Sequence, residues 1–497
     1  MPRRLERWHI VLAAGVAMVL AIAAIAVVTM RSAPSRVVAS GDAVVVAAED
    51  ERRAPDAVVV EVTLRAAPTT VRIGDRDVDT WAFNDQVPGP ELRLKAGDVL
   101  RARVENRLAD PLTIHWHGID LRADMDGVPE VSQEPIAPGE DFTYEFAVPN
   151  AGTYFYHSHV GVQLDRGLYG PLIVDDPAEE LDYDREVTVL LDDWLDGLGR
   201  TPDDTLSELQ RSAGHGMHGD HGSMGPTADS PLGSDTGDVD YPYFLANGRM
   251  PDDPPEVAVT TGERVRLRVI NAASDTAFRV ALGGAELTIT HTDGRPVLPV
   301  ETDAVLLGMG ERYDALVTIT DSGVLPLVAS AEGKDGQALA VLRSGQGRLE
   351  AADLQPAELS GRLLALDQLE ASPAVDLGGG EPDRTYQVPL TGGMHGYEWG
   401  VEGEHVDGVT MPVREGERVR LILENDTMMW HPMHLHGQPF QVQVASGQGP
   451  VKDTVNVAPF EQVTIDFVAD NPGTWMLHCH NIYHAETGMH TLINYVE

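Results

Sequence analysis

The sequence predicts an all-β protein made of three related β-sandwich domains that follow an N-terminal apolar segment. The chain has 497 residues, contains 49 Gly and 33 Pro residues, and repeats one pattern of alternating apolar and charged residues three times. A chain of this length exceeds an ordinary single domain. Abundant Gly and Pro favour turns between short strands, and a repeat at domain spacing indicates duplication of one folding unit.

The first 56 residues are interpreted as an anchor or signal followed by a linker. Three arginines lie within the first seven residues, and the 21 residues from Ile10 to Met30 carry no charge. At ~1.5 Å per residue this segment spans a ~30 Å hydrocarbon core. We favour an uncleaved membrane anchor that leaves the rest of the chain exported, outside the cytoplasmic membrane. The alternative is a signal peptide that is cleaved near VVAS, residues 37–40, and releases a secreted protein.

The charge of the chain excludes some partners. There are 36 Lys and Arg residues against 78 Asp and Glu residues, which gives a net charge of −42. Nucleic acid and anionic lipid are therefore poor partners, because both require basic patches. The single cysteine excludes an intramolecular disulfide. We expect the exported part to be a monomer.

The threefold repeat divides the chain into domains. Its copies are KAGDVLRARVEN at 95–106, TTGERVRLRVIN at 260–271 and REGERVRLILEN at 414–425, each ending in Asn nine positions after its Gly. Alternation with period two predicts a half-buried strand in each copy. The copies lie 165 and 154 residues apart, so we expect domains at 57–178, 184–350 and 360–497.

A second repeat carries histidines in the outer domains only. Residues 137–159 align with 458–480 without gaps, and both segments end in H-x-H. An H-x-H-G motif also follows the repeated Asn in both outer copies, whereas Val280, Leu282, Val328 and Ser330 occupy the matching positions of the middle copy. Residues i and i+2 of a strand face the same side, so each pair presents two imidazoles to one space. The four pairs are His115/His117, His157/His159, His434/His436 and His478/His480.

The single cysteine lies inside the last of these pairs. Cys479, His484 and Met489 form C-x4-H-x4-M, and His431 lies 48 residues before the cysteine. Two His and one Cys in a trigonal arrangement, with a weak axial Met, are the ligands of a blue-copper electron-transfer site. Because Cys479 has a histidine on each side, its thiolate is a short path for electrons from such a site to a neighbouring metal cluster.

The motifs as a set resemble those of three-domain multicopper oxidases, which include laccases and bacterial copper-resistance oxidases. They are HWHG at 115–118, HSH at 157–159, HPMHLHG at 431–437 and HCHNIYHAETGM at 478–489. The resemblance covers nearly all of the chain after residue 57. It implies cupredoxin-like Greek-key sandwiches, four copper ions, and the coupling of four one-electron oxidations to the reduction of O2 to water.

The resemblance also implies how the ligands are divided. The type 1 copper takes His431, Cys479, His484 and Met489; the type 2 copper takes His115 and His434; one type 3 copper takes His117, His157 and His480, and the other takes His159, His436 and His478. Reduction of O2 needs protons, and Asp126 matches an aspartate that the family keeps near type 2. The second acid of many relatives has no exact counterpart here, and Glu486 is the nearest carboxylate, which we expect to be either a proton relay or a solvated acid.

The sequence does not decide between several substrates. A Gly-rich run, residues 212–228, carries three histidines and two methionines that suit copper, or it is a linker of biased composition. The five side chains are His215, Met217, His218, His221 and Met224. We expect an oxidase of Cu(I) or another metal ion in copper tolerance. The alternatives are a laccase-like oxidase of phenols and aromatic amines and, less favoured, a copper carrier without turnover.

Overall fold

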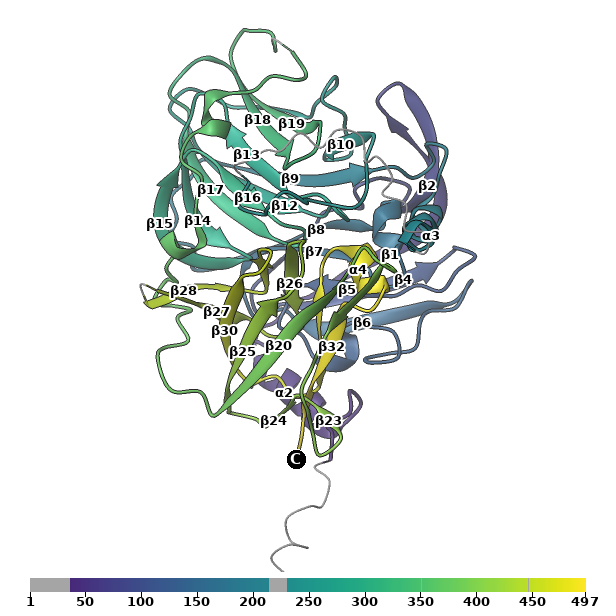
Figure 1. The fold of residues 1–497 in the computed structure, drawn as a ribbon. Coiled ribbons are helices and arrows are strands. Elements are labelled where there is room, and N and C mark those ends of the chain that lie inside the picture. The colour runs from purple at the N-terminus through teal and green to yellow at the C-terminus, as the bar shows by residue number, and fades with distance from the viewer. Residues whose placement is uncertain (1–35, 214–229, 350, 446) are drawn as a thin grey trace, which may run out of the picture.

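The computed structural model describes residues 36–213, 230–349, 351–445 and 447–497, and its architecture is all-β (Figure 1). The strands form three consecutive units of two packed sheets each. This confirms the predicted fold class. The predicted anchor from Ile10 to Met30 lies outside the described residues, as does nearly all of the His/Met-rich run.

The first unit packs two four-stranded sheets. One sheet has the order β2-β1-β4-β6 and the other β3-β8-β7-β5. Their bounds are β1 Val59–Ile73, β2 Arg76–Phe83, β3 Leu92–Lys95, β4 Val99–Asn106, β5 Ile114–His117, β6 Asp141–Ala147, β7 Gly152–Ser158 and β8 Tyr169–Asp175.

The second unit packs a six-stranded sheet of order β10-β9-β12-β17-β14-β15 on a five-stranded sheet of order β11-β19-β18-β13-β16. Its strands are β9 Arg185–Trp194, β10 Tyr243–Ala246, β11 Glu256–Ala258, β12 Arg264–Asn271, β13 Phe278–Leu282, β14 Leu287–Thr292, β15 Arg295–Thr302, β16 Val305–Leu307, β17 Arg312–Thr318, β18 Gly323–Ala331 and β19 Gln337–Ser344.

The third unit repeats the design with sheets β21-β20-β25-β30-β27-β28 and β24-β32-β31-β26-β29, beside the hairpin β22-β23. Its strands are β20 Arg384–Gly393, β21 Glu398–Val401, β22 His405–Val406, β23 Val409–Thr410, β24 Pro412–Val413, β25 Arg418–Asn425, β26 His431–Leu435, β27 Phe440–Val444, β28 Gly447–Lys452, β29 Thr454–Val457, β30 Gln462–Val468, β31 Thr474–Cys479 and β32 His490–Tyr495.

The threefold repeat forms the same strand in each unit, and its last residue explains the pattern. β4, β12 and β25 each run parallel to the first strand of their unit and end in Asn106, Asn271 and Asn425. Each Asn side chain donates Nδ2–H to at least two backbone carbonyls of its unit and accepts the backbone N–H two residues later. A buried side-chain amide whose nitrogen donates and whose oxygen accepts hydrogen bonds fixes the turn that follows the strand.

The predicted half-burial holds for β4 and β25 but is wrong for β12. Every residue of β12 after Arg264 is buried, including Arg266 and Arg268. Thr153 of the first unit donates a hydrogen bond to Asp314, which accepts from both arginines. The face expected to meet water is therefore covered by the neighbouring unit, and its charges are paired there.

The described part of the predicted linker is packed against the sandwiches. Helix α2, Ala43–Arg52, buries Val45 and Glu49, and Glu49 accepts the backbone N–H of Ala147. Val38 donates its N–H to the carbonyl of Tyr495, so this segment touches the C-terminal strand as well. The described residues of the expected linker thus place side chains in a space between the first and third units.

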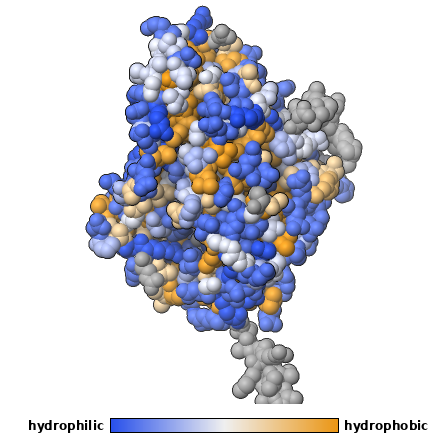
Figure 2. Space-filling model, turned by 90° about the vertical axis from the view of Figure 1, so that its left-hand side faces the viewer, coloured by the Kyte–Doolittle hydropathy of each residue, from blue (hydrophilic) through white to orange (hydrophobic). Residues whose placement is uncertain are grey.

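The remaining helices are short. They are α3 Pro202–Ala213, α4 Ile482–Glu486, η1 Ala123–Met125, η2 Gln163–Arg166, η3 Ala357–Ser360 and η4 Leu366–Gln368. Within the described ranges, none of the helices has the length and apolar character needed to cross a bilayer. Hydrophilic residues dominate the face shown in Figure 2, in keeping with the net charge of −42.

Candidate metal centre

Cys479 and two histidines gather at the end of the third sandwich. Its Sγ lies 3.8 Å from Nδ1 of His431 and 3.8 Å from Nδ1 of His484, and these two nitrogens are 3.2 Å apart. His431 begins β26, Cys479 ends β31, and His484 comes from α4. Met489 is fully buried, and its backbone bonds to both Cys479 and His484. The four residues named from the sequence therefore meet in one place.

The eight paired histidines form one continuous cluster between the first and third units. β5 places His115 opposite His157 on β7, and β26 places His434 opposite His478 on β31. Figure 1 shows β5, β7, β26 and α4 near the middle of the molecule. The ligand atoms within each of three groups lie no more than 4.8 Å apart: His115, His117 and His434; His117, His157 and His480; and His159, His436 and His478.

Backbone and carboxylate acceptors fix the ring orientations. Nδ1 of His115, His157, His434 and His478 donates to a main-chain carbonyl, and Nδ1 of His436 contacts Asp126 Oδ2. These bonds leave the Nε2 lone pairs free. His436 Nε2 lies only 3.0 Å from His478 Nε2, and His434 Nε2 lies 3.4 Å from His115 Nε2. Two neutral acceptors at that distance need a cation between or beside them.

The protonation states also suit copper. Burial lowers the pKa of eight of these imidazoles, so they are neutral at pH 7. Burial raises the pKa of the Cys479 thiol, so a cation must replace its proton before the thiolate forms. Buried nitrogens of His117, His157 and His480 have no hydrogen-bond partner among the described residues. Neutral imidazoles beside one thiol and one thioether fit copper well.

The chain was then compared with known proteins. Sequence models described as multicopper oxidase match residues 65–179, 185–347 and 381–496. The chain is 44% identical over 489 residues to the multicopper oxidase MmcO of Mycobacterium tuberculosis, covering 98% of this chain and 96% of that protein. The chain belongs to the multicopper oxidase family. This makes it a copper-dependent oxidoreductase.

Two further similarities extend over most of the chain. A copper resistance protein A homolog of Pseudomonas syringae pv. tomato is 31% identical over 542 residues, covering 86% of this chain and 91% of that protein. The crystal structure of a multi-copper oxidase from Pseudomonas thermotolerans superposes with a TM-score of 0.67 at 30% identity, covering 89% of this chain and all of that one. Multicopper oxidases use O2 together with a metal or phenolic substrate.

The two acids chosen from the sequence lie in different surroundings within this oxidase. Asp126 is fully buried, with Oδ2 at 2.9 Å from His436 Nδ1 and Oδ1 at 3.2 Å from His115 Nδ1. Glu486 ends α4, on the side of the Cys479 group, and is exposed. Asp126 therefore touches the histidine cluster directly, whereas Glu486 has no hydrogen bond to it among the described residues.

A second carboxylate at the cluster was missed from the sequence. Asp453 Oδ1 lies 3.2 Å from His117 Nε2, and its main-chain oxygen accepts from His434 Nδ1. Arg312 of the middle unit is fully buried and donates Nη1–H and Nη2–H to this carboxylate, at 2.7 Å each. One signal was available, because Asp453 is the sole acid between Gly437 and Ala458. Nothing in the sequence pointed to Arg312.

The middle unit also reaches the Cys479 group. Asp238 Oδ2 accepts a hydrogen bond from His484 Nε2 at 2.8 Å and another from the Tyr397 hydroxyl at 2.7 Å. Its side chain is 1% exposed. The ring of Trp399 lies over His484, with a centroid distance of 4.1 Å. The middle unit thus contributes Arg312 to the surroundings of the histidine cluster and Asp238 to the surroundings of the Cys479 group.

Proposed function

We propose that this multicopper oxidase acts on metal ions, with Cu(I) as the first candidate donor in copper tolerance and O2 as the acceptor. Bound copper supplies the one-electron steps, in which four electrons taken singly from the donor, together with four protons, convert one O2 into two waters. The protein's own residues hold the metals, exclude bulky donors from the Cys479 group and deliver protons to the histidine cluster.

We propose four copper ions, divided as the side chains are grouped. The type 1 site is His431, Cys479, His484 and Met489; the type 2 site is His115 and His434; the type 3 sites are His117, His157 and His480, and His159, His436 and His478. The test is elemental analysis of the loaded protein together with electron paramagnetic resonance. Four coppers per chain, with one type 1 and one type 2 signal, are expected.

The enclosure of His484 carries the argument for a metal-ion donor. His431 and His484 are fully buried, and Asp238, Tyr397 and Trp399 cover the outer edge of His484. A phenol ring therefore has no direct contact with either imidazole. A carboxylate on the outer edge of His484 instead favours a cationic donor, because its negative charge attracts one.

A thioether beside this group supports the same donor. Met428 lies three residues before His431 and is 73% exposed, whereas Met429 and Met433 are buried in the core, as expected for packing residues. An exposed thioether suits Cu(I). The proposed accessory ligands His215, Met217, His218, His221 and Met224 lie outside the described residues, and we retain them as a proposal on the sequence alone.

Oxygen uptake by copper-loaded protein lacking residues 1–30 is the deciding experiment. We would compare Cu(I) with a methoxyphenol, in wild type, in Asp238→Asn and in a variant lacking 214–229. Asp240→Asn is the matched control, because Asp240 is an exposed acid of the same segment. A higher kcat/KM for Cu(I), lowered by Asp238→Asn but not by Asp240→Asn, is expected.

Other outcomes are equally informative. If the phenol has the higher kcat/KM and Asp238→Asn leaves Cu(I) turnover unchanged, the laccase-like alternative replaces the metal-ion proposal. If deleting residues 214–229 lowers turnover of Cu(I) but not of the phenol, these residues collect the Cu(I) donor. If the deletion leaves both turnover rates unchanged, these residues serve only as a linker. Full copper loading without oxygen uptake from either donor leaves only a copper carrier.

We propose that Asp126 relays protons to the cluster. The carboxylate is buried and contacts histidines of two different groups, so a proton held on it would lie directly beside the cluster. Glu486 remains a second proposal, on the sequence alone. Its exposure makes it a group that exchanges protons with solvent rather than with the cluster.

We also propose that the protein is exported and held at the membrane by the segment from Ile10 to Met30, as a monomer with domains at 57–178, 184–350 and 360–497. The docking of α2 and Val38 against the sandwiches would keep an uncleaved anchor close to the folded body. Sequencing the N-terminus of the membrane-bound and soluble fractions distinguishes an anchored from a secreted protein.

A further inference from the structure

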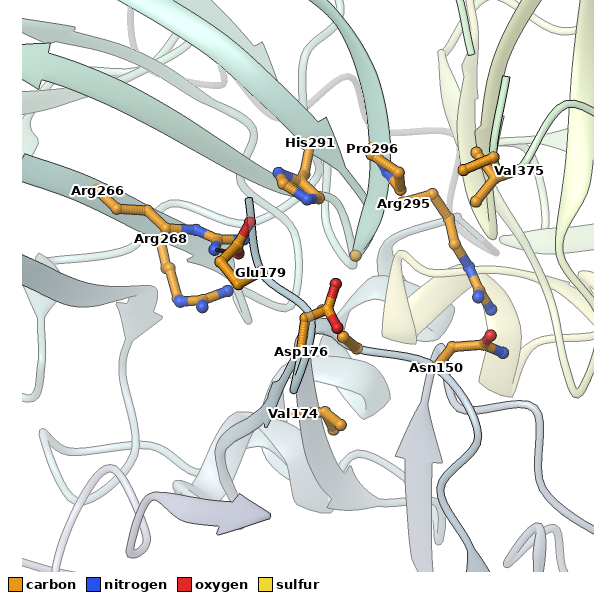
Figure 3. A pocket seen from close by; sticks show the side chains of 14 residues that line it. Asn150, Val174, Asp176, Glu179, Arg266, Arg268, His291, Arg295, Pro296 and Val375 are labelled. Carbon is orange, nitrogen blue, oxygen red and sulfur yellow. Dashed lines mark hydrogen bonds and ion pairs between the residues drawn. The ribbon is translucent and has the colours of Figure 1, made fainter. Parts of the chain in front are cut away.

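A cavity of about 190 Å³ lies where the three units meet, apart from the copper ligands (Figure 3). Its walls come from residues 150–152 and the end of β8 in the first unit, from β12 and the β14–β15 hairpin in the second, and from residues 374–375 before the third. Figure 3 shows Arg266 and Arg268 on one side, Arg295 on the opposite side, and His291 between them. No role in copper chemistry explains this arrangement.

The cavity contains cationic donors that the protein leaves partly unused. Arg268 is 2% exposed, and its Nη1 and Nη2 donate to Thr153, Asp314 and Glu186. Its Nε is buried and has no acceptor among the described residues. A buried guanidinium N–H without an acceptor is unfavourable. This nitrogen has almost no accessible surface, so the donors open to a ligand are those of the opposite wall.

The opposite wall carries guanidinium N–H groups that have no acceptor among the described residues. Arg295 donates only through Nη2, to both oxygens of Asp120 at 2.8 Å, so its Nε and Nη1 lack a hydrogen bond within the described ranges. His291 Nδ1 contacts the hydroxyl of Thr290, and burial lowers the pKa of His291 to about 4. The ring is therefore neutral at pH 7 and can donate one N–H. Donors thus face the cavity from two sides.

Charge selects the kind of ligand. The lining itself holds three arginines and two acids, Asp176 and Glu179, while Asp314, Glu186 and Asp120 pair with the same arginines from outside the lining. Glu179 is already paired with Arg266 at 2.6 Å. A metal cation here would face three guanidinium groups, whereas an oxyanion would accept charge-assisted hydrogen bonds from them. The volume equals roughly six water molecules, which suits a small anion and excludes a drug-sized ligand.

We propose that this junction cavity binds a small oxyanion of the phosphate or sulfate class, held by the free N–H groups of Arg295 and by His291. Because all three units form the walls, the bound anion stabilises their packing. The site binds in the folded protein alone, so its occupancy raises the stability of the whole chain.

Isothermal titration of the copper-loaded protein with inorganic phosphate, at constant chloride and ionic strength, tests the proposal. Wild type is expected to bind one phosphate saturably. Arg295→Gln is expected to weaken binding at least tenfold. Arg264→Gln, on the same strand as Arg266 but not lining the cavity, is the matched control and is expected to change the Kd less than twofold.

A second variant covers the case in which Arg295→Gln does not fold. His291→Ala leaves the Arg295–Asp120 ion pair intact and is expected to weaken phosphate binding at least threefold. Sulfate and acetate, titrated in the same way, separate a tetrahedral dianion from a monocarboxylate. The proposal is overturned if wild type shows no saturable binding of any of these anions, or if His291→Ala and Arg264→Gln bind phosphate with equal affinity.

Discussion

The pair formed by Arg312 and Asp453 provides the sharpest test of how the middle unit serves the metal centre. Arg312→Met removes four hydrogen bonds: two to the Asp453 carboxylate, one to the carbonyl of Thr153 and one to that of Gly310. Breaking one partner of a buried ion pair costs about 3–5 kcal/mol, because the other charge is left uncompensated. Burial alone would raise the pKa of Asp453, but Arg312 outweighs it and holds that pKa well below its usual range. In the variant, burial is no longer opposed by Arg312, so the pKa of Asp453 is expected to rise.

Two quantities should change together. Asp453 orients His117 and His434, and loss of such a supporting contact typically weakens metal binding about 10–100-fold. Urea unfolding followed by circular dichroism gives the stability, and competition with a chelator gives the copper affinity. Arg279→Met is the matched control, since Arg279 makes a two-bond ion pair with Glu332 in the same unit, away from the histidines. Equal behaviour of the two variants in both assays would refute the reasoning.

Two other predictions concern carboxylates. Asp126→Asn preserves shape but removes the buried acid, so oxygen uptake should fall by about 100-fold or more at saturating donor, while Asp124→Asn, in the same loop, should have little effect. Burial would raise the pKa of Asp314, but Arg266 and Arg268 outweigh it and lower that pKa. A depressed pKa gives stability that is full above pH ~4 and is lost as pH falls below that value. Acid titration followed by circular dichroism should therefore show a flatter stability curve for Asp314→Asn than for wild type.

The parts of the fold that depend on local periodicity could be predicted from the sequence. Strands β4 and β25 alternate between buried and partly exposed residues as expected, and the spacing of each H-x-H pair placed two rings in one space. β12 has the same alternation, yet Arg266 and Arg268 are buried. Their partners Asp314 and Glu186 lie 46 and 82 residues from Arg268. No local pattern contains such a pairing, because it joins β12 to its sheet neighbours β17 and β9, which are distant in sequence, and the burial comes from the first unit.

The residues of the metal centre that the sequence analysis missed also depend on contacts between distant parts of the chain. Arg312 lies 141 residues from Asp453, and Asp238 lies 246 residues from His484. Both come from the unit that contains none of the predicted type 1, type 2 or type 3 ligands, so a search for those ligand motifs ignores them. At the positions that match the outer histidines, Val280 and Leu282 belong to an apolar core shared with the third unit, whereas Val328 belongs to a smaller cluster of the middle unit. That core fixes the positions from which Arg312 and Asp238 reach the ligands.

Gly310 shows how closely the middle unit approaches the cluster, and it offers a clean measurement of that contact. A Cβ at Gly310 would lie 3.0 Å from both His117 Cε1 and His480 Cδ2, and the backbone φ is +85°. Gly284 has nearly the same φ, +83°, with nothing within 4 Å of a Cβ. An Ala substitution at either position therefore carries the same backbone strain, about 1–2 kcal/mol. The difference between the two variants isolates the contact with the histidines. Gly310→Ala should lose copper to a chelator several-fold faster than Gly284→Ala, and identical rates would show that the loop before Arg312 does not hold the two rings in place.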